Sequence, residues 1–507
     1  MALFLAALLI VGARMPTVPG ADSVVIEGGR IAAIGRGLSR PGAQVIDAGG
    51  RLLLPGFIDS HVHLLGGGLS LGGVSLEGAR SVEEVLARVR AWAAAHPDAP
   101  WIVGRGWSYD LFPGAMPTRQ LLDGATGKRP AVLRAYDGHT SWVNSAALGL
   151  SRIGPQDPPG GRVVREPGGA PAGALLEDAM DLVRPPRASP REMALALRAA
   201  QDRALRAGIV AVHELAADAG DVEVYVELAK RGELVLRVFF SPPLETPLPA
   251  AAALRERLSG RLRFGTLKGF VDGVVESGTA HFISEGRGGE PALRARVKAA
   301  AEAGFSVSLH AIGDGAVRFA LDAFAAAPRR RHRVEHVEVL DPADARRFAE
   351  LGVVASMQPF HAEPSDSPGA GAWEKRVGAR LPHTFPWREL RDAGATLAFG
   401  SDWPVMSLDP LRGLAVATSR RNGRGLPRDG WVAAQKLTFA EALDGYTRGA
   451  ASGLRAEEEL GSIAVGRGAD LVLLSERADP AEPLSLYWGS IDLTLIDGRV
   501  VYERKAR

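Results

Sequence analysis

The chain has 507 residues, of which 46% are hydrophobic and 23% charged, a composition typical of a folded protein with a large core and not of a disordered chain. The 60 Lys and Arg residues nearly balance the 58 Asp and Glu residues, and the net charge of +2 gives little support for a nucleic-acid partner. The chain has no cysteine, which excludes disulfides and thiolate metal sites and leaves His, Asp, Glu or a modified side chain as metal ligands.

The chain begins with an apolar run, MALFLAALLIVGARM. No Lys or Arg precedes this run and no small-residue cleavage site follows it, which argues against a signal peptide. The run is also shorter than the roughly 20 residues that a membrane-spanning helix needs. We therefore predict a first β-strand in LLIVGARM and expect a cytoplasmic protein without a membrane segment, with export as the alternative.

The two ends of the chain carry similar hairpin patterns. A Gly-Gly pair divides two apolar runs in DSVVIEGGRIAAIG, and an Asp-Gly pair does the same in LTLIDGRVVYE, which follows the strand-like ADLVLLS. Such pairs between β-rich runs indicate tight hairpins. Neither end is long enough to form a core alone. We therefore predict one small β-sandwich domain built from residues 1–54 and 455–507.

The middle of the chain, residues 55–454, alternates short apolar strands with amphipathic helical segments. Eight strands are predicted, in LLLPGFIDSHVH from Leu52, IVAVHEL from Ile209, LVLRVFFSP from Leu234, FGTLKGFVDG from Phe264, FSVSLHAIGD from Phe305, HRVEHVEVL from His332, GVVASMQP from Gly352 and TLAFGSDWP from Thr396. An alternation of eight strands with helices predicts an α/β fold, a TIM (β/α)8 barrel.

A long segment separates the first two of these strands, and we predict an insertion over about residues 65–205. It contains the partly strand-like WIVGRGWSYDLF and RPAVLRAYDGHTSWVNSAAL, and a loop rich in Pro and Gly. Loops that follow barrel strands lie on the catalytic face. We therefore expect the insertion to cover the active site and to contribute to substrate specificity.

Polar side chains suited to metal binding fall near the C-terminal ends of most of the strands, where barrel enzymes place their catalytic groups. In chain order they are His61, His63, His213, Lys268, Asp272, His310, His336 and Asp402. Residues i and i+2 of a strand share a face, so His61 and His63 can bind one ion together. Each residue taken singly is equally well explained by a structural hydrogen bond or a turn. Their joint occurrence on the first, fifth, sixth and eighth strands favours a metal site.

Lys268 is an unexpected residue at such a site. A lysine is rarely buried without a partner, and a cation beside metal ions is repelled. One interpretation is a salt bridge to Asp272. The other is that the neutral amine has reacted with carbon dioxide, because a carbamate replaces the cation by a carboxylate-like ligand that can bridge two metal ions.

Motifs along nearly the whole chain resemble those of the amidohydrolase superfamily, and more narrowly the amidohydrolase family 3 branch that includes N-substituted formamide deformylases. They are PGFIDSHVHL, GRGWSYDLF, PAVLRAYDGHTSWVNSAAL, LKGFVDGVVESGTA, LHAIGDGAV, HRVEHVEV, GSDWPV and LTFAEALDGYTRGAA followed by GSIAVGRGADLVLL. As a set these motifs are specific for the superfamily and much less so for a substrate. Two features depart from the family pattern: Glu214 follows His213 where an Asp is expected, and the N-terminal domain is short.

The resemblance implies a divalent metal site with one or two ions. His61 and His63 would bind the first ion, and a carboxylated Lys268 would bridge to a second ion held by His310 and His336. Asp402 would bind the first ion and act as general base and then general acid, in a reaction that uses a metal-activated water. Zinc suits these ligands best, although manganese, iron, cobalt and nickel also accept them.

Further side chains are candidates for contacts with the substrate. His139 and His213 are catalytic candidates that could contact the substrate or its oxyanion, and structural hydrogen bonding explains them equally well. Glu177, Trp107 and Trp403 are candidates for substrate binding. Their alternatives are a solvated helix position for the glutamate and simple packing for the two tryptophans.

These observations predict a metal-dependent hydrolase that cleaves a C–N bond in an amide, N-formyl or cyclic amide compound. The alternatives are hydrolysis of an ester, a deamination, or a non-catalytic regulator that kept the fold. The chain lacks a dinucleotide-binding glycine fingerprint, which disfavours redox chemistry. The expected partner is a small-molecule substrate, not a nucleic acid or a membrane. A homo-oligomer is allowed, because nothing in the sequence fixes the oligomeric state.

Overall fold

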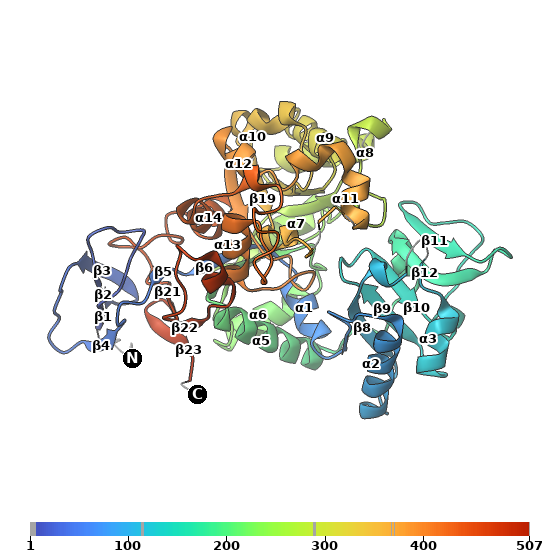
Figure 1. The fold of residues 1–507 in the computed structure, drawn as a ribbon, viewed down its shortest axis with the longest axis horizontal. Coiled ribbons are helices and arrows are strands. Elements are labelled where there is room, and N and C mark those ends of the chain that lie inside the picture. The colour runs from blue at the N-terminus through green and yellow to red at the C-terminus, as the bar shows by residue number, and fades with distance from the viewer. Residues whose placement is uncertain (1–6, 113–115, 287–289, 367, 370, 506–507) are drawn as a thin grey trace.

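Two parallel β-sheets form the centre of the protein in the computed structural model, which describes residues 7–505 except 113–115, 287–289, 367 and 370 (Figure 1). The first sheet has the order β15 (Leu262–Phe264), β14 (Arg237–Ser241), β13 (Ile209–Leu215), β6 (Phe57–Val62). The second has the order β16 (Leu267–Phe270), β17 (Val307–Ala311), β18 (Arg333–His336), β19 (Val354–Met357), β20 (Thr396–Phe399). Most of these strands are short and buried on both faces, as expected for parallel sheets covered by helices.

Backbone contacts join the two central sheets at both edges. A parallel bridge pairs Pro243, beyond the end of β14, with Lys268 on β16. At the other edge the amide of Asp402 donates to the carbonyl of His61 over 2.7 Å, and the amide of His63 donates to the carbonyl of Trp403 over 2.9 Å. Each of the eight predicted strands overlaps a strand of these two sheets.

Two predicted strands are interrupted in the structure. The run from Leu52 to His63 forms β5 (Leu53–Pro55), which pairs antiparallel with β21, and then β6, which pairs parallel with β13. The break falls at Gly56, where a Cβ atom would clash with Val210. The fourth predicted strand is likewise divided into β15 and β16. The backbone amide of Thr266, between them, donates to the Ser241 hydroxyl over 2.7 Å and not to the backbone of a neighbouring strand.

The two ends of the chain form two small sheets that lie side by side (Figure 1). Their strands are β1 (Leu8–Val11), β2 (Ser23–Glu27), β3 (Arg30–Gly35) and β4 (Gln44–Asp47) in one sheet, and β5, β21 (Leu471–Leu474), β22 (Ile491–Ile496) and β23 (Arg499–Glu503) in the other. The predicted Gly-Gly and Asp-Gly turns are present, both with positive φ. One apolar core includes Leu8 and Ile10 from the first sheet and Leu471 and Leu495 from the second. The apolar run at residues 1–6 lies outside the described residues.

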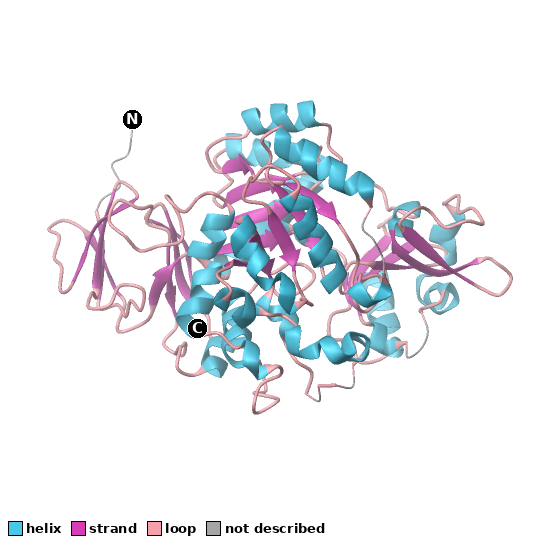
Figure 2. Ribbon diagram, turned by 90° about the horizontal axis from the view of Figure 1, so that it is seen from above, coloured by secondary structure: helices cyan, strands magenta, loops and turns pink. Residues whose placement is uncertain are grey.

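The segment between β6 and β13 forms a sheet of its own, which Figures 1 and 2 show on the side of the molecule opposite the terminal sheets. Its strands are β7 (Val74–Ser75), β8 (Ile102–Trp107), β9 (Ala131–Ala135), β10 (Thr140–Val143), β11 (Gly161–Arg165) and β12 (Pro171–Glu177). Helices α2 (Val82–Ala95) and α3 (Arg119–Thr126) pack on this sheet. Helices α1 (Leu64–Ser70) and α5 (Pro190–Arg206) pack against each other where the segment leaves and rejoins the central sheets.

Helices surround the central strands in Figure 2. The remaining helices are α4 (Ser145–Gly149), α6 (Val222–Lys230), α7 (Leu248–Arg257), α8 (Pro291–Glu302), α9 (Asp314–Ala325), α10 (Ala345–Leu351), α11 (Ala372–Val377), α12 (Trp387–Asp392), α13 (Pro410–Ser419), α14 (Phe439–Tyr446), α15 (Arg448–Gly453) and α16 (Pro483–Tyr487). Among the described residues, no helix is both long enough and apolar enough to cross a membrane.

Candidate metal centre and active site

A cavity of about 330 Å³ opens at the C-terminal ends of the central strands. Predicted metal ligands from five different strands line it: His61, His63, Lys268, His310, His336 and Asp402. Neighbouring parallel strands end at the same edge of a sheet, and for this reason side chains far apart in the sequence meet here. The structure therefore brings the whole predicted ligand set to one cavity.

The ring nitrogens of His61 and His63 show how this part of the cavity is built. The Nδ1 atom of His61 lies 2.8 Å from a carboxylate oxygen of Glu335, and that of His63 lies 2.9 Å from the carbonyl oxygen of Leu215. Both partners only accept, so each Nδ1 carries a proton, and the neutral form of each ring would have its lone pair on Nε2. These Nε2 atoms lie 3.3 Å and 3.1 Å from Oδ1 of Asp402. Three electron-pair donors thus converge, which is the arrangement that a divalent cation requires.

A second group of possible ligands shares Asp402. It consists of His336, His361 and Asp402, whose ligand atoms lie within 4.8 Å of one another. The Nδ1 atom of His336 lies 2.9 Å from Oε1 of Gln358, which again leaves Nε2 unprotonated. Burial opposes ionisation of Asp402, but the neighbouring His61 and His63 outweigh it and hold the pKa of the carboxyl well below its usual value. Asp402 is therefore a carboxylate that can serve both groups.

His310 stands beside the second group. Its ring centroid lies 4.5 Å from that of His336, and its Nδ1 lies 3.1 Å from Oδ1 of Asp272. Burial lowers the pKa of both His310 and His336 well below the usual value, so both rings are neutral, as a metal ligand must be. Asp272 is a positioning residue, because its oxygens also accept the backbone amides of the loop that follows His310.

Lys268 is buried in the cavity wall, with 1% of its surface exposed. Its Nζ atom has no hydrogen-bond partner in the part of the chain that the structure describes, including Asp272. Burial lowers the pKa of the amine to about 8. The neutral amine that carbon dioxide requires is therefore accessible near neutral pH.

The backbone around Asp402 is held in place by Asp59, which the sequence analysis did not single out. One oxygen of Asp59 accepts the amides of His61, at 3.1 Å, and Ser401, at 2.9 Å, and the other accepts the Ser401 hydroxyl at 2.5 Å. A Cβ atom at Gly400 would lie 2.5 Å from the amide nitrogen of His61, so only glycine allows this close approach. Asp402 itself has φ of 57°, an uncommon conformation that fits a functional position.

Comparisons with known proteins agree with this geometry. The family model described as "Amidohydrolase family" matches residues 44–502. This chain belongs to the amidohydrolase family. The match confirms the resemblance that the motifs predict, and with it the predicted enzyme class, an amidohydrolase acting on carbon–nitrogen bonds.

Individual relatives cover nearly the whole amidohydrolase chain. It is 32% identical to Protein LONG AFTER FAR-RED 3 of Arabidopsis thaliana, over 90% of this chain and 85% of that protein. It is 28% identical to the N-substituted formamide deformylase of Arthrobacter pascens, over 98% of each. A crystal structure of an uncharacterized metal-dependent hydrolase from Pyrococcus furiosus superposes with a TM-score of 0.72 and 26% identity, covering 94% of this chain and 99% of that one. The fold is therefore the α/β fold of metal-dependent hydrolases.

His139 reaches the cavity of the amidohydrolase from the inserted sheet, on the loop between β9 and β10. Its ring centroid lies 5.6 Å from that of His310, and its Nδ1 lies 2.7 Å from Oε2 of Glu177. Burial opposes protonation of His139, but the hydrogen bond and charge of Glu177 outweigh it and raise the pKa to about 9. Glu177 is not among the described residues that line the cavity, and its other oxygen accepts the Thr279 hydroxyl. The structure thus connects Glu177 to the cavity through His139.

Three other predicted residues lie away from the cavity. Trp107 is fully buried in the core of the inserted sheet, where its Nε1 donates to the carbonyl of Leu133. Trp403 packs in the central core, where a Cβ atom at Gly67 would clash with its ring. His213 is buried with its Nε2 2.7 Å from the Ser241 hydroxyl. None of the three is among the described residues lining the cavity, so packing and structural hydrogen bonds, the alternatives weighed for them, describe these positions.

His361 and Glu335, like Asp59, are residues of the site that the sequence analysis missed. The seventh predicted strand ends at Pro359, and His361 follows two residues later in a short helical turn, so a search that continued one turn past each strand would have found it. Glu335 immediately precedes His336 on β18. Nothing in the sequence shows that the Glu335 side chain contacts His61 on β6. The departure at Glu214 also has an explanation, because this longer side chain accepts the amide of Leu64, 2.5 Å away, beside His63.

Proposed function

We propose that this amidohydrolase hydrolyses the C–N bond of a small N-acyl compound at a divalent metal site formed by His61, His63 and Asp402. The observation that carries the proposal is the convergence of two Nε2 atoms on one carboxylate oxygen, with both Nδ1 atoms placed beside acceptors. An N-formyl group is the preferred acyl group, because the deformylase relative acts on N-substituted formamides.

A divalent ion, which we propose to be zinc, would polarise the substrate carbonyl and lower the pKa of a water molecule to about 7. The donor set of imidazole and carboxylate without thiolate suits zinc. His310 and His336 would hold a second ion. Asp402 would accept a proton from the attacking water and deliver it to the leaving nitrogen, which departs as an amine.

We propose that Lys268 is carboxylated and would then be a ligand for the divalent metal. The neutral Nζ amine adds to the carbon of dissolved carbon dioxide, an N–C bond forms, one C–O electron pair moves onto oxygen, and the nitrogen releases one proton to water. The product is an anion where the ammonium was a cation. The buried Nζ without a hydrogen-bond partner supports this role, because a permanent cation there would be buried without a hydrogen-bonded anion.

His139 would orient the substrate from the insertion. Since Glu177 accepts from Nδ1 of His139, Nε2 is the ring nitrogen left to donate to the substrate carbonyl oxygen. Glu177 would act as a positioning residue. His213, Trp107 and Trp403 would act through packing.

We also propose the domain organisation that such a site requires. Residues 55–454 would form one (β/α)8 barrel with the insertion at about 65–205, and residues 1–54 with 455–507 would form a composite β-sandwich domain. The bridge at Lys268 and the hydrogen bond from Asp402 to His61 support closure of the barrel. The apolar core shared by Leu8 and Leu495 supports the composite domain.

Metal analysis and a formate-release assay together test the proposed function. The protein would be purified without chelator and with bicarbonate, analysed by elemental mass spectrometry, and assayed with a panel of N-alkylformamides. We expect one or two ions per chain, loss of metal and of formate release in His61→Ala, and neither loss in the exposed control His96→Ala. A wild-type protein without metal, or His61→Ala with full metal content, would overturn the proposal.

A further inference from the structure

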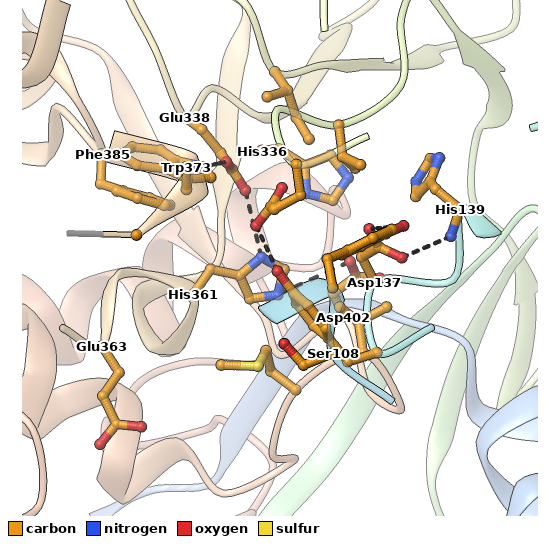
Figure 3. A pocket seen from close by; sticks show the side chains of 18 of the residues that line it. Ser108, Asp137, His139, His336, Glu338, His361, Glu363, Trp373, Phe385 and Asp402 are labelled. Carbon is orange, nitrogen blue, oxygen red and sulfur yellow. Dashed lines mark hydrogen bonds and ion pairs between the residues drawn. The ribbon is translucent and has the colours of Figure 1, made fainter. Parts of the chain in front are cut away.

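The cavity that holds the histidine cluster is also lined by acids. The carboxylates there are Asp110, Asp137, Glu276, Glu338, Glu363 and Glu374. Among the described residues, Lys268 is the one Lys or Arg that lines the cavity, and it lies with the metal ligands. Figure 3 shows Glu338 beside Trp373 and Phe385 on one side of the cavity, and Asp137 with His139 on the other.

Two of these carboxylates accept hydrogen bonds from tyrosine hydroxyl groups. Glu276 accepts the Tyr136 hydroxyl at 2.6 Å, and Asp137 accepts the Tyr109 hydroxyl at 2.9 Å. Both donors are neutral, so they satisfy hydrogen-bonding capacity without cancelling charge. His139 compensates part of the charge of Asp137, because its backbone amide donates to Asp137 Oδ1 over 2.9 Å, and its imidazole also pairs with Glu177 over 2.7 Å.

Glu338 lies between an indole and an imidazole. Its Oε2 accepts the indole Nε1–H of Trp373 at 3.1 Å, and its Oε1 lies 3.6 Å from Nδ1 of His361. Burial, followed by the negative charges of Glu338 and Asp137, raises the pKa of Glu276 to about 7. Glu276, Glu338 and Asp137 therefore repel one another across this end of the cavity, and a bound cation would relieve the repulsion.

Aromatic rings stand next to these carboxylates. The ring of Trp373 stacks on that of Phe385 at 5.5 Å and lies 5.6 Å from that of Trp431, and all three line the cavity. The buried Arg420 contacts Phe385 and Trp431, does not line the cavity, and donates to backbone carbonyls that include Trp431. A rigid aromatic wall beside carboxylates is the chemistry that recognises an organic cation.

These acidic residues share one cavity with the proposed reacting centre. Oδ1 of Asp402 and Nζ of Lys268 lie in the same wall, both at least nine-tenths buried and both without a hydrogen-bond partner in the described part of the chain. A molecule bound there would contact these atoms and the Glu276 and Glu338 carboxylates in one cavity.

We propose that the substrate carries an organic cation, an ammonium or amidinium group, which lies between Glu276, Glu338 and Asp137 beside the Trp373 ring while the scissile amide lies at Asp402. This inference rests on the proposed function for the scissile bond, and it adds the chemical class of the remainder of the substrate. A substrate of this class is a singly N-acylated diamine, whose hydrolysis releases the acyl acid and a diamine.

Binding of a matched pair of probes tests the inference without turnover. Choline and 3,3-dimethylbutan-1-ol have the same shape, and one carries a positive charge where the other has a carbon atom. Titration of the zinc-loaded protein, followed by tryptophan fluorescence, would give their Kd values. We expect choline to bind about tenfold more tightly, a difference of about 1.4 kcal/mol. Equal binding, or tighter binding of the neutral alcohol, would overturn the inference.

Isosteric variants test which carboxylates cause the preference for choline. Glu276→Gln and Glu338→Gln should each reduce the preference for choline at least about threefold, since each removes one negative charge from the cavity. Glu302→Gln changes an exposed glutamate at the end of α8 and should leave the preference unchanged. A preference that survives in both cavity variants would place the cation elsewhere and refute the assignment.

A pair of substrates connects the inference to catalysis. N-(4-aminobutyl)formamide and N-pentylformamide differ by an ammonium in place of a methyl group, and we expect about tenfold higher kcat/KM for the former. If neither is hydrolysed while choline is still preferred, formamide hydrolysis fails and the cation site stands. If both are hydrolysed equally well and choline is not preferred, the proposed function stands and the cation site is refuted.

Discussion

Glu335→Gln tests whether the buried side chains behind His61 hold the metal centre together. Oε1 of Glu335 lies 2.8 Å from Nε of Arg333, and Oε2 lies 2.8 Å from Nδ1 of His61. Arg333 and Glu335 are both completely buried. Arg333 also donates to the Ser60 carbonyl and the Ser356 hydroxyl, but it forms no other ion pair in the described part of the chain.

The expected effect follows from that geometry. Glutamine keeps the shape and one oxygen acceptor, but it leaves the Arg333 guanidinium as an unpaired buried cation. Breaking a buried ion pair lowers the free energy of unfolding by about 3–5 kcal/mol. Because Arg333 keeps its two neutral hydrogen-bond partners, we expect a loss of about 3 kcal/mol for Glu335→Gln. His61 also loses its anionic partner, a change that lowers metal affinity by about 10- to 100-fold.

Two measurements check this prediction. Urea unfolding of the metal-free protein gives the loss of stability, and competition with a chromogenic chelator gives the zinc affinity. The control is Glu457→Gln, which removes an ion pair to Arg331 of similar length, 2.7 Å, from a partly exposed position. Exposed pairs contribute about 0–1 kcal/mol, so the control should be nearly silent. Equal effects of the two variants on stability and on zinc affinity would refute the role assigned to Glu335.

The remaining predictions concern the reacting groups and their supports. Asp402→Asn should keep the fold by circular dichroism and lower formate release at least about a thousandfold, and unchanged turnover would move the acid–base role to another residue. Lys268→Ala should lower the metal content measured in the presence of bicarbonate, and full content with wild-type activity would exclude the carbamate. Gly400→Ala should lower both the unfolding temperature and the zinc affinity, because the added Cβ would lie 2.5 Å from the His61 amide nitrogen. Wild-type values of both quantities would contradict this close packing. Glu177→Gln should lower kcat by about tenfold with the metal content unchanged, whereas a loss of metal would make Glu177 part of the metal site.

The polar site residues at the ends of the central strands could be predicted from the sequence for a physical reason. Parallel strands are apolar along their length and place polar groups at their C-terminal ends, so His310, His336 and Asp402 stand out in the sequence. The spacing of His61 and His63 adds a shared face. The family match confirms the amidohydrolase class that these positions and the surrounding motifs indicate.

Contacts between distant strands could not be predicted in the same way. Glu335 belongs to an alternating run, and its partner His61 lies 274 residues earlier in the chain. Trp107 belongs to a motif next to the site, but an indole that lines a cavity and one that fills a core have the same sequence pattern. Gly56 divides one apolar run between two sheets, and only the clash with Val210 shows why the strand breaks there.

The site joins two parts of the chain with different tasks. The central strands supply donors that are fixed by neighbours such as Glu335 and Asp59, an arrangement suited to a cation whose position must not vary. The insertion supplies Asp137 and His139 from one loop, on the side facing the aromatic rings. Because the proposed metal ligands come from the central strands, substitutions in the insertion should alter substrate binding more than they alter the metal site.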